Sequence, residues 1–563
     1  MTSIFLFRLL AVVLFFTSAT IQSQSLNWVK PINGNGNTFA QNIAVDAQGN
    51  SYILGEFTGS IDLDPSAGEY TLTALGEYDL YVAKFDTDGN FAWARHYGST
   101  GSEATRYITV DVAGNIYATG QFSGTIDFDP GAGNASYTNI GFGDIFVVKL
   151  NSNGDLIWAK QIGGPGADWC EAINIDTSGM VFLTGFFRGT VDFNPGSENY
   201  SLTAFGDDAF ICKLDQNGEF LWAKHFGGAS SVSVILRDSK LDAAGNICVA
   251  GYFLGTADFD PSAVVFNLTT IANTDIFVAK YDTNGNFFWA RQQGGQLNES
   301  VSTIAIDSDN NIYTTGYFSG AVDFDPGNAI MSLSSIGNDD AFICKLDANG
   351  DLVWAKRLGG TLQDFARDLK IDATGNLYVS GYFQQTADFE LGTGTYELTA
   401  AGLKDGFILQ LSADADLLSV YTLGGLGNDS ISSFDIDALG SLYGCGYFSQ
   451  TVDFDPEAAV VNLFATGNLD GFVMKLNPNA LGTQQPKSAK VLKLYPNPTA
   501  DYFQIGIANS GEIIQITITD VHGKILKTFA NQPKYEISDL SVGVYLVQAY
   551  MANGRFVQKL VKE

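Results

Sequence analysis

Short apolar runs and tight polar turns alternate along most of this chain, and the pattern returns at a nearly constant interval. The turn sequence Asp-x-x-Gly-Asn, or a close variant, occurs seven times, with gaps of 65, 65, 66, 65, 65 and 65 residues between its aspartates: Asp46, Asp111, Asp176, Asp242, Asp307, Asp372 and Asp437. A Trp-containing strand, a D-F-D-P segment and a D-x-F-V-x-K-L strand keep the same step. Self-similarity at a fixed period indicates a repeat architecture.

Each repeat contains four short strands separated by turn residues. In the second repeat we expect strand a at residues 108–111, strand b at 116–122, strand c at 144–150 and strand d at 156–162. Four-stranded units of this kind are typical of propeller blades. The pattern therefore predicts an all-β fold, a seven-bladed β-propeller over residues 25–479 with four-stranded blades.

The alternation of strand a indicates its place in the blade. Residues one and three before the turn aspartate are apolar in nearly every repeat, whereas residues two and four before it are mixed or polar. One apolar face and one wettable face fit a strand that lines a central channel. The Trp strand is then outermost, and residues 26–32 would supply the missing outer strand of the last repeat and close the ring.

The longest connections join strand b to strand c, and the links from strand d to the next strand a, which begin with Gly-Gly, lie on the same face. Binding residues gather on such loops, so we expect any ligand site at that face. Residues 480–490 are predicted to be a linker. Residues 491–563 lack the repeat motifs and are predicted to form a small C-terminal β-sandwich domain.

Residues 1–23 have the pattern of a signal peptide, with Arg8 before an apolar run and small residues near the end. The run is too short to span a bilayer, and we expect no transmembrane segment elsewhere. The formal net charge is -31, and residues 1–486 hold 21 basic against 55 acidic side chains, a net of -34. Such a surface repels nucleic acid, so we expect no nucleic-acid partner.

Cysteine and histidine offer little chemistry. Five cysteines are an odd number for a disulfide framework, and Cys212 and Cys344 occupy strand positions that are apolar in other repeats, so we expect them to be buried. His96 and His225 share one position in strand d, which we expect to be exposed. Only one further histidine exists, outside the repeats, so histidine triads and histidine metal sites are disfavoured.

The D-F-D-P aspartates allow two interpretations, illustrated by Asp127, Asp129, Asp323 and Asp325. They could be oxygen ligands of Ca²⁺. Two carboxylates are few for a calcium site, and the sixth repeat has Glu390 in place of the second aspartate. We favour aspartates that cap a turn, with Phe128 and its equivalents buried in the core, and we expect no cofactor.

Residues that break the sevenfold pattern are the best candidates for a site, because a purely structural position should carry a similar residue in every repeat. On the channel face the candidate ligand-binding residues are Tyr107, Asp238, Lys240, Asp368 and Lys370. Asp238, Asp368 and Asp435 could instead be the acid and base of a glycosidase or lyase. Asp238 with Lys240, and Asp368 with Lys370, could equally be local charge pairs in a wet channel, which we favour.

Two family resemblances follow from specific motifs. Residues 25–479 resemble the bacterial SBBP seven-bladed β-propeller repeat proteins, through G-N-I-Y-A-T-G at residues 114–120 and D-I-F-V-V-K-L at 144–150, with small changes in the other repeats. The C-terminal region resembles the type A sorting domain of the type IX secretion system. Its motifs are Tyr495-Pro496-Asn497-Pro498, the turn at 520–524, the segment 540–545 that includes Gly543 and Tyr545, and the closing residues 559–563.

The second resemblance implies passage through the outer membrane by the type IX machinery of a Bacteroidetes-like bacterium. It also implies removal of the domain, and release or attachment at the cell surface. The uniform repeats and the shortage of catalytic residue types predict a non-catalytic binding or structural module with an extracellular glycan or protein ligand. The alternative is a polysaccharide-active enzyme that uses the channel carboxylates.

Overall fold

Strands form both compact units of this computed structural model, which lie within residues 1–484 and 485–563. The structure describes residues 23–480 except 67, 197, 230, 393 and 456–459. Beyond these it describes 492–495, 499–507, 513–519, 524–530, 532–551 and 554–562. The predicted signal peptide and linker therefore fall almost wholly outside the described residues. The all-β prediction is confirmed, since every regular element of the described chain is a strand.

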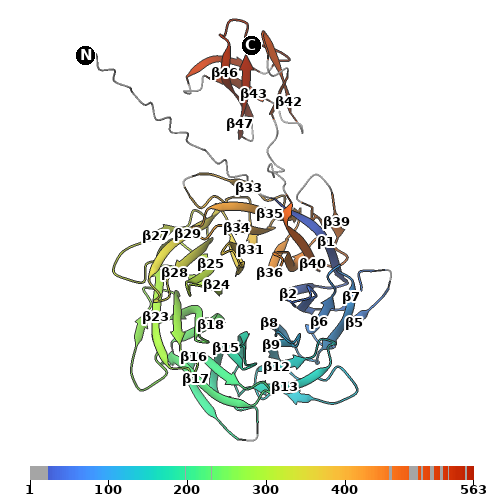
Figure 1. Ribbon diagram of the computed structural model, residues 1–563, viewed down its shortest axis with the longest axis vertical. Coiled ribbons are helices and arrows are strands. Elements are labelled where there is room, and N and C mark those ends of the chain that lie inside the picture. Colours follow the sequence, from blue (N-terminus) through green and yellow to red (C-terminus); the bar gives the residue numbers. More distant parts are fainter. Residues whose placement is uncertain are drawn as a thin grey trace, which may run out of the picture. The chain divides into compact units, whose positions relative to one another are not determined.

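The first unit is a ring of four-stranded antiparallel sheets around a central axis (Figure 1). Strand a of each blade is innermost, and the seven a strands are β2 (Thr38–Val45), β8 (Ala104–Val110), β14 (Trp169–Ile175), β18 (Ser233–Leu241), β24 (Glu299–Ile306), β30 (Phe365–Ile371) and β36 (Ser430–Ile436). The b strands are β3 (Ser51–Phe57), β9 (Ile116–Phe122), β15 (Val181–Asp192), β19 (Ile247–Leu254), β25 (Ile312–Phe318), β31 (Leu377–Phe383) and β37 (Leu442–Phe448).

The outer half of each blade holds strands c and d. The c strands are β6 (Asp79–Phe85), β12 (Asp144–Leu150), β16 (Ser201–Leu214), β22 (Asp275–Tyr281), β28 (Asp340–Leu346), β34 (Asp405–Leu411) and β40 (Asp470–Ala480). The d strands are β7 (Phe91–Tyr97), β13 (Leu156–Ile162), β17 (Phe220–Gly228), β23 (Phe287–Gly295), β29 (Leu352–Gly360), β35 (Leu417–Gly425) and, for blade 7, β1 (Ser23–Gly34).

Strand β1 closes the ring as the sequence predicts. It pairs antiparallel with β40, with Val29 opposite Met474 and Ile32 opposite Gly471. The edge that β40 would otherwise present is thereby paired, which removes a template for association with other chains.

The b–c connections are more ordered than the open loops that the sequence suggests. Six of them contain a hairpin of two three-residue strands: β4 (Ser60–Asp62) with β5 (Thr71–Thr73), β10 (Thr125–Asp127) with β11 (Ser136–Thr138), β20 (Thr256–Asp258) with β21 (Asn267–Thr269), β26 (Ala321–Asp323) with β27 (Ser332–Ser334), β32 (Thr386–Asp388) with β33 (Glu397–Thr399), and β38 (Thr451–Asp453) with β39 (Asn462–Phe464). In blade 3 the same pairing joins the ends of β15 and β16. The hairpin often extends the sheet of the preceding blade, as where β4 pairs with β1 and β20 with β17, so it connects neighbouring blades.

The core lies between adjacent blades. Phe128, which follows β10, is fully buried and contacts Phe122, Phe146 and Tyr97, with ring centroids 5.2 to 5.8 Å apart. Burial of one such side chain stabilises the fold by about 2 kcal/mol. The predicted role of Phe128 in the core is confirmed, and all five cysteines are buried and free.

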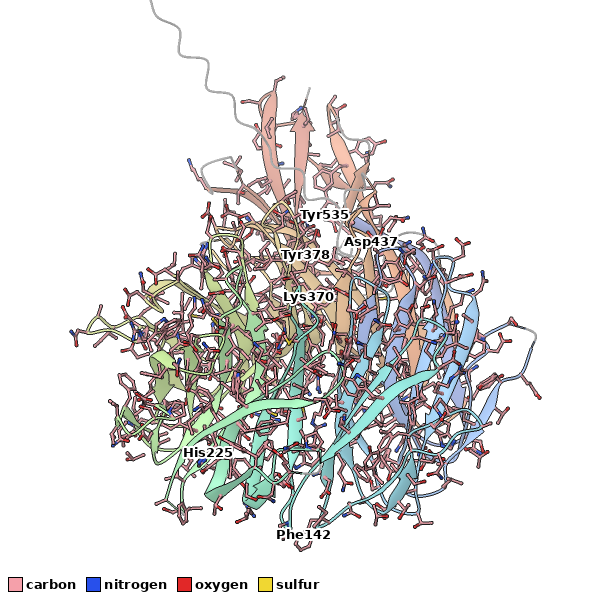
Figure 2. The ribbon with its side chains drawn as sticks, turned by 60° about the horizontal axis from the view of Figure 1, so that its bottom comes forward. Phe142, His225, Lys370, Tyr378, Asp437 and Tyr535 are labelled. Carbon is pink, nitrogen blue, oxygen red and sulfur yellow. The ribbon has the colours of Figure 1, made fainter. Side chains whose placement is uncertain are left out.

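The two ends of the propeller differ. The a–b and c–d turns lie at one end, here called the turn end, and the b–c and d–a connections lie at the other, the loop end. Figure 2 shows Asp437, in an a–b turn, far from Phe142, which is 85% exposed in a b–c connection. Any ligand reaching the loop end therefore meets the longest connections.

The second unit contains two small antiparallel sheets. One has the order β41 (Leu492–Tyr495), β42 (Tyr502–Ile507) and β45 (Tyr535–Glu536). The other has the order β44 (Ile525–Ala530), β43 (Ile513–Thr519), β46 (Gly543–Met551) and β47 (Gly554–Lys562). Phe503, Ile516, Ile518 and Val547 are among its buried core.

Candidate functional site at the propeller channel

Every inner strand carries a β-bulge at the same place. In β8 the pairing with β9 shifts between Thr105 and Tyr107, so that Arg106 is an extra residue. A bulge places two consecutive residues opposite one and redirects a side chain. The extra residues of the seven strands are Gln41, Arg106, Glu171, Arg237, Ser302, Arg367 and Ser432.

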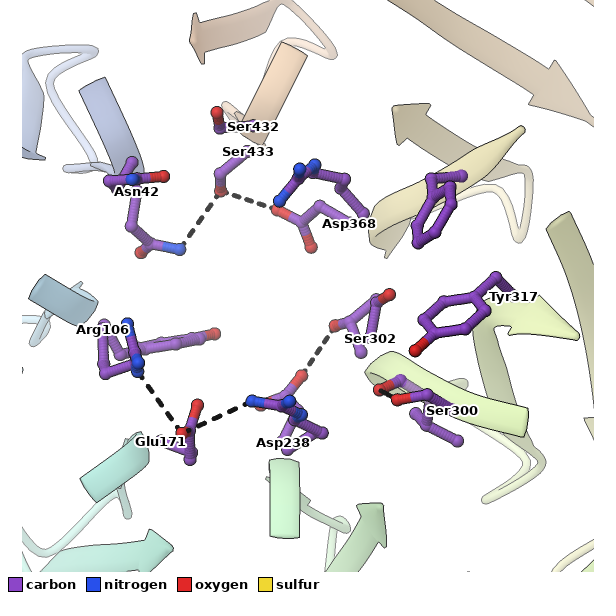
Figure 3. Close-up of a pocket in the computed structure, with 17 residues that line it drawn as sticks. Asn42, Arg106, Glu171, Asp238, Ser300, Ser302, Tyr317, Asp368, Ser432 and Ser433 are labelled. Carbon is purple, nitrogen blue, oxygen red and sulfur yellow. Dashed lines mark hydrogen bonds and ion pairs between the residues drawn. The ribbon is translucent and has the colours of Figure 1, made fainter. Parts of the chain in front are cut away.

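The bulges surround a cavity of about 350 Å³ on the channel axis, to which all seven inner strands contribute. Its wall includes the seven bulge residues, and Figure 3 shows the polar side chains converging from several blades. Aromatic residues near the loop end, such as Tyr317 and Phe365, also line it. A second cavity, of about 560 Å³, lies toward the turn end, and Tyr107 borders both.

Tyr107, Asp238 and Lys240 meet in the channel. Lys240 Nζ donates to both Asp238 oxygens at 2.8 and 2.9 Å and to the Tyr107 hydroxyl at 3.1 Å. Burial lowers the pKa of Lys240, but the Asp238 carboxylate and Tyr107 together outweigh it, so the pKa is raised. Lys240 thus remains protonated and linked to a tyrosine two blades away.

Asp368 and Lys370 form a matching pair in blade 6. Lys370 Nζ donates to the Asp368 oxygens at 2.9 and 3.1 Å, and the carboxylate raises the pKa of Lys370 against the effect of burial. Asp435 accepts from the backbone N–H of Val45 at 2.8 Å and of Ile436 at 2.9 Å. Burial raises the pKa of Asp435.

These carboxylates also join neighbouring blades. An inner strand leaves N–H groups unpaired on its channel side, and buried N–H groups need an acceptor. Asp238 Oδ2 accepts from Ile304 N of the next blade at 3.1 Å, and Asp368 Oδ2 from Phe434 N at 3.2 Å. Asn42 Oδ1 accepts from Ile108 N in the same way at 3.1 Å.

The structure therefore brings together the channel residues that the sequence singles out, and favours their description as local charge pairs. The structure also places the bulge residues on the channel wall, whereas strict alternation assigns them to the apolar face of the strand. A signal for them exists in the sequence: Arg106-Tyr107, Arg237-Asp238 and Arg367-Asp368 are consecutive non-apolar residues, and an unbroken strand cannot place both members of such a pair on one face.

The bulge residues carry an uneven charge. Arg106 Nε lies 3.3 Å and Arg237 Nη1 3.6 Å from the same oxygen of the buried Glu171. Arg367 is exposed and, within the described part of the chain, forms no ion pair. Since Asp238 and Asp368 are balanced by their lysines, three arginines face one glutamate at this level.

Aromatic rings accompany the arginines. Phe365 stacks on Tyr382 with centroids 5.2 Å apart at 17°, and Tyr317 lies 4.5 Å from Phe365. Arg106 Cζ lies 4.3 Å from the centroid of Trp169. On the Tyr382 ring, Lys404 Nζ lies 4.2 Å and Arg367 Cζ 5.5 Å from the centroid.

The D-F-D-P aspartates cap their turns. Asp127 Oδ1 accepts from the backbone N–H of Asp129 at 3.0 Å and of Ala135 at 2.8 Å, and Asp129 Oδ1 accepts from Gly131 N at 2.8 Å. Asp323 and Asp325 repeat this arrangement. Within the described residues, no group of three or more His, Cys, Asp or Glu side chains is arranged to hold a metal ion.

A second set of carboxyl groups lies buried at the loop end. In five blades an acidic residue that begins or precedes strand a is buried near the aspartate that begins strand c of the preceding blade. Burial raises the pKa of Glu103, Asp168, Asp364 and Asp429 to about 7 and of Glu299 to about 8. The adjacent Gly-Gly has a steric reason, because a Cβ on Gly163 would lie 2.2 Å from Asp144 Cγ.

The strand-d histidines are half-buried, so the expectation that they are exposed is wrong. His96 Nε2 lies 2.6 Å from Asp79 Oδ2, and His225 Nδ1 lies 3.1 Å from Asp208 Oδ2. Gln161 contacts Asp144 in the equivalent place. The position faces the strand-c aspartate, which strand pairing alone does not reveal in the sequence.

Of the proposed sorting motif, Pro496, Asn497 and Pro498 lie outside the described residues. Tyr495 is the last residue of β41 and Gly543 the first of β46. The Tyr545 hydroxyl donates to the Ser541 carbonyl at 2.7 Å. No helix in the described part of the chain is long and apolar enough to cross a membrane.

Comparison with curated proteins finds relatives of low sequence identity. The chain is 26% identical over 429 residues to an uncharacterized WD repeat-containing protein of Acanthamoeba polyphaga mimivirus, covering 63% of this chain and 31% of that protein. It is 27% identical over 454 residues to the regulatory protein FlaEY of Caulobacter vibrioides, covering 76% and 45%. The chain thus spans less than half the length of either relative.

Similar solved structures are distant. One is a protein of unknown function from Bacteroides caccae, with 11% identity and a TM-score of 0.31, covering 61% of this chain and 94% of that one. Another is the exotype rhamnogalacturonan lyase YesX, with 12% identity and a TM-score of 0.27, covering 79% and 90%. Scores this low say nothing about activity.

Two family models match this chain directly. Residues 493–563 match the secretion system C-terminal sorting domain, and residues 289–317 match the β-propeller repeat called SBBP. Both resemblances drawn from the motifs are confirmed. The chain therefore contains an SBBP-type β-propeller repeat and a type IX C-terminal sorting domain, and it is secreted to the cell surface.

Proposed function

We propose that the propeller is a non-catalytic module that binds an extracellular ligand at the loop end of its channel. The observation that carries this proposal is the state of the channel carboxylates. Both oxygens of Asp238 accept hydrogen bonds, from Ser239 N and Lys240 on one side and from Thr303, Ile304 N and Lys240 on the other. Asp368 is held in the same way by Lys370, Leu369 N, Ser433 and Phe434 N.

A general acid must carry a proton to the leaving group, and a base must reach the proton that it removes. A carboxylate whose oxygens already accept hydrogen bonds from a lysine and from the backbone of the next blade is not free to reorient toward a substrate. These two aspartates therefore suit cohesion of the ring better than acid–base chemistry. The cavity above them remains open to a ligand.

The test is to incubate the secreted protein with a panel of polysaccharides and surface proteins, and to measure binding and reaction products separately. We expect binding without products. If a glycan is cleaved, and Asp238→Asn with Asp368→Asn lowers turnover a hundredfold or more, the order expected for loss of a general acid or base, the module is an enzyme.

We propose further that the propeller requires no calcium for its stability, because one oxygen of the first D-F-D-P aspartate accepts two backbone N–H groups and one oxygen of the second accepts one. The expected result is that a chelator leaves the unfolding midpoint unchanged. A fall of several degrees that Ca²⁺ restores and Mg²⁺ does not would assign these residues to an ion instead.

A further inference from the structure

We infer that the cavity formed by the bulge residues binds an anionic saccharide. This inference rests on the proposed function, since it names the ligand of the same site. Three properties of the wall carry it: charge, aromatic faces and hydroxyl groups.

The charge of the wall is opposite to that of the chain. Arg106 and Arg237 share one carboxylate, Glu171, and Arg367 has none within the described residues. Lys404 adds a cation next to Tyr382, and its pKa is lowered by burial and by Arg367. In a protein with a net charge of -31, this concentration of cations attracts an anion to one place. Arginine is also the side chain best shaped for carboxylate, sulfate or phosphate oxygens.

The aromatic rings give the site a second chemistry. Tyr317 and Phe365 line the cavity with centroids 4.5 Å apart, whereas Tyr382, which stacks on Phe365, and Trp169, which stacks on Phe186, are not among the lining residues. Aromatic faces of this kind pack against the apolar face of a sugar ring. A small inorganic anion would leave them unused.

Hydroxyl groups complete the wall. Ser300, Ser302, Ser432 and Ser433 line the cavity from blades 5 and 7 (Figure 3). The Ser432 Oγ is buried and has no hydrogen-bond partner among the described residues. Serine hydroxyls both donate and accept hydrogen bonds, which suits the hydroxyl groups of a sugar.

An acidic peptide is the other anion to consider, and the inner strands do not favour it. Extended peptides are commonly bound by adding a strand to a free sheet edge. Here the edge N–H groups of Ile108, Ile304 and Phe434 are already bound by Asn42, Asp238 and Asp368. The wall therefore offers side chains rather than backbone, as recognition of a saccharide requires.

The test uses three tetrasaccharides with one backbone: cellotetraose, its C6-oxidised glucuronate form and its 6-O-sulfated form. Calorimetric titration into the secreted protein should show binding of one or both charged forms and much weaker binding of cellotetraose. The two charged arms distinguish carboxylate from sulfate. Binding should weaken as salt is added, because the attraction is partly electrostatic.

Arg367→Gln is the decisive variant, because this side chain is exposed and supports no ion pair in the described chain. We expect it to weaken binding roughly tenfold or more, the loss typical of one charged hydrogen bond. Arg237→Gln should act similarly. Arg188→Gln is the matched control, since Arg188 pairs with Asp207 outside the channel, and it should change nothing.

Several results would overturn the inference. They are equal binding of charged and neutral tetrasaccharides, insensitivity to both channel arginines, no binding of any form, or tighter arginine-dependent binding of a glutamate-rich peptide. The proposed function survives if a ligand of another chemical class binds at the loop end of the channel without reaction. Conversely, cleavage of a charged saccharide bound through Arg367 would sink the non-catalytic proposal and leave this inference standing.

Discussion

Single carboxylates in the channel stabilise both their own strand and the neighbouring blade. Asp238 neutralises Lys240 within its own strand and accepts the backbone N–H of Ile304 in the next blade. Position four before the turn aspartate holds Asn42, Asp238 or Asp368 in three blades, and in each of them the side chain reaches the following blade. These side chains therefore work as joints between blades.

We expect Asp238→Asn to lower the free energy of unfolding by about 2 kcal/mol, because a charged hydrogen-bond acceptor is lost while Lys240 stays buried. The double variant with Lys240→Met should cost less than the sum of the single changes, since the two residues are coupled. Denaturant unfolding measures both. Asp155→Asn is the control. The Asp155 side chain is 66% exposed and its ion pair with Arg95 is long, at 3.9 Å, so its loss should change the free energy of unfolding little. Additive single and double variants would contradict this assignment.

At the scale of the element, five blades repeat the same buried acidic contact at the loop end. The acidic residue before or at the start of strand a is deprived of water, and its pKa rises toward neutrality in five blades. In the unfolded chain the same groups have a pKa near 4. Between these values the folded protein binds more protons than the unfolded chain.

Stability should therefore fall as the pH rises from about 4 to about 7, and then level off above pH 8. Turn residues such as Asp86 and Asp282 have a lowered pKa, so their contribution to stability is lost as the pH falls below about 4. We expect the highest unfolding midpoint in mildly acidic buffer. The Asp168→Asn variant should show a shallower decline, and Asp88→Asn in a surface turn should not. An unfolding midpoint that rises steadily from pH 5 to 8 would contradict the predicted effect of the buried acids.

The blade itself could be predicted closely from the sequence, and the exceptions have physical reasons. In blade 2, strands b, c and d lie at the expected residues, whereas strand a begins at Ala104, earlier than expected. The bulge at Arg106 breaks the alternation from which its start was inferred. The sequence does not reveal the acidic contacts, because Asp144 and Asp168 are 24 residues apart and meet only when blades 2 and 3 pack together. The three-residue strands of the hairpins are too short for any periodicity to reveal.

At the scale of the whole molecule, the chain divides its tasks between two units. The propeller carries the cavity, and residues 493–563 match a domain that directs secretion. We expect removal of 493–563 to leave a soluble, folded propeller in the periplasm, because no blade takes a strand from these residues in the described structure. Cell fractionation with thermal unfolding of the retained protein measures both points.

The control for that experiment is a fusion of residues 485–563 to an unrelated periplasmic protein, which should reach the surface. Normal surface amounts of the truncated chain would show that another part of the sequence directs export. Loss of the cooperative unfolding transition would show instead that the propeller depends on the second unit.

The pairing of β1 with β40 sets the order in which the ring can be finished. β1 is the first propeller strand to leave the ribosome and β40 the last (Figure 1). Blades 1 to 6 can each form from consecutive strands, but blade 7 must wait for both ends of the propeller to be present, and closing so long a loop is slow. A chain that ends prematurely has no partner for β1 and cannot close. Ring closure thus distinguishes complete copies from truncated ones before any ligand is met.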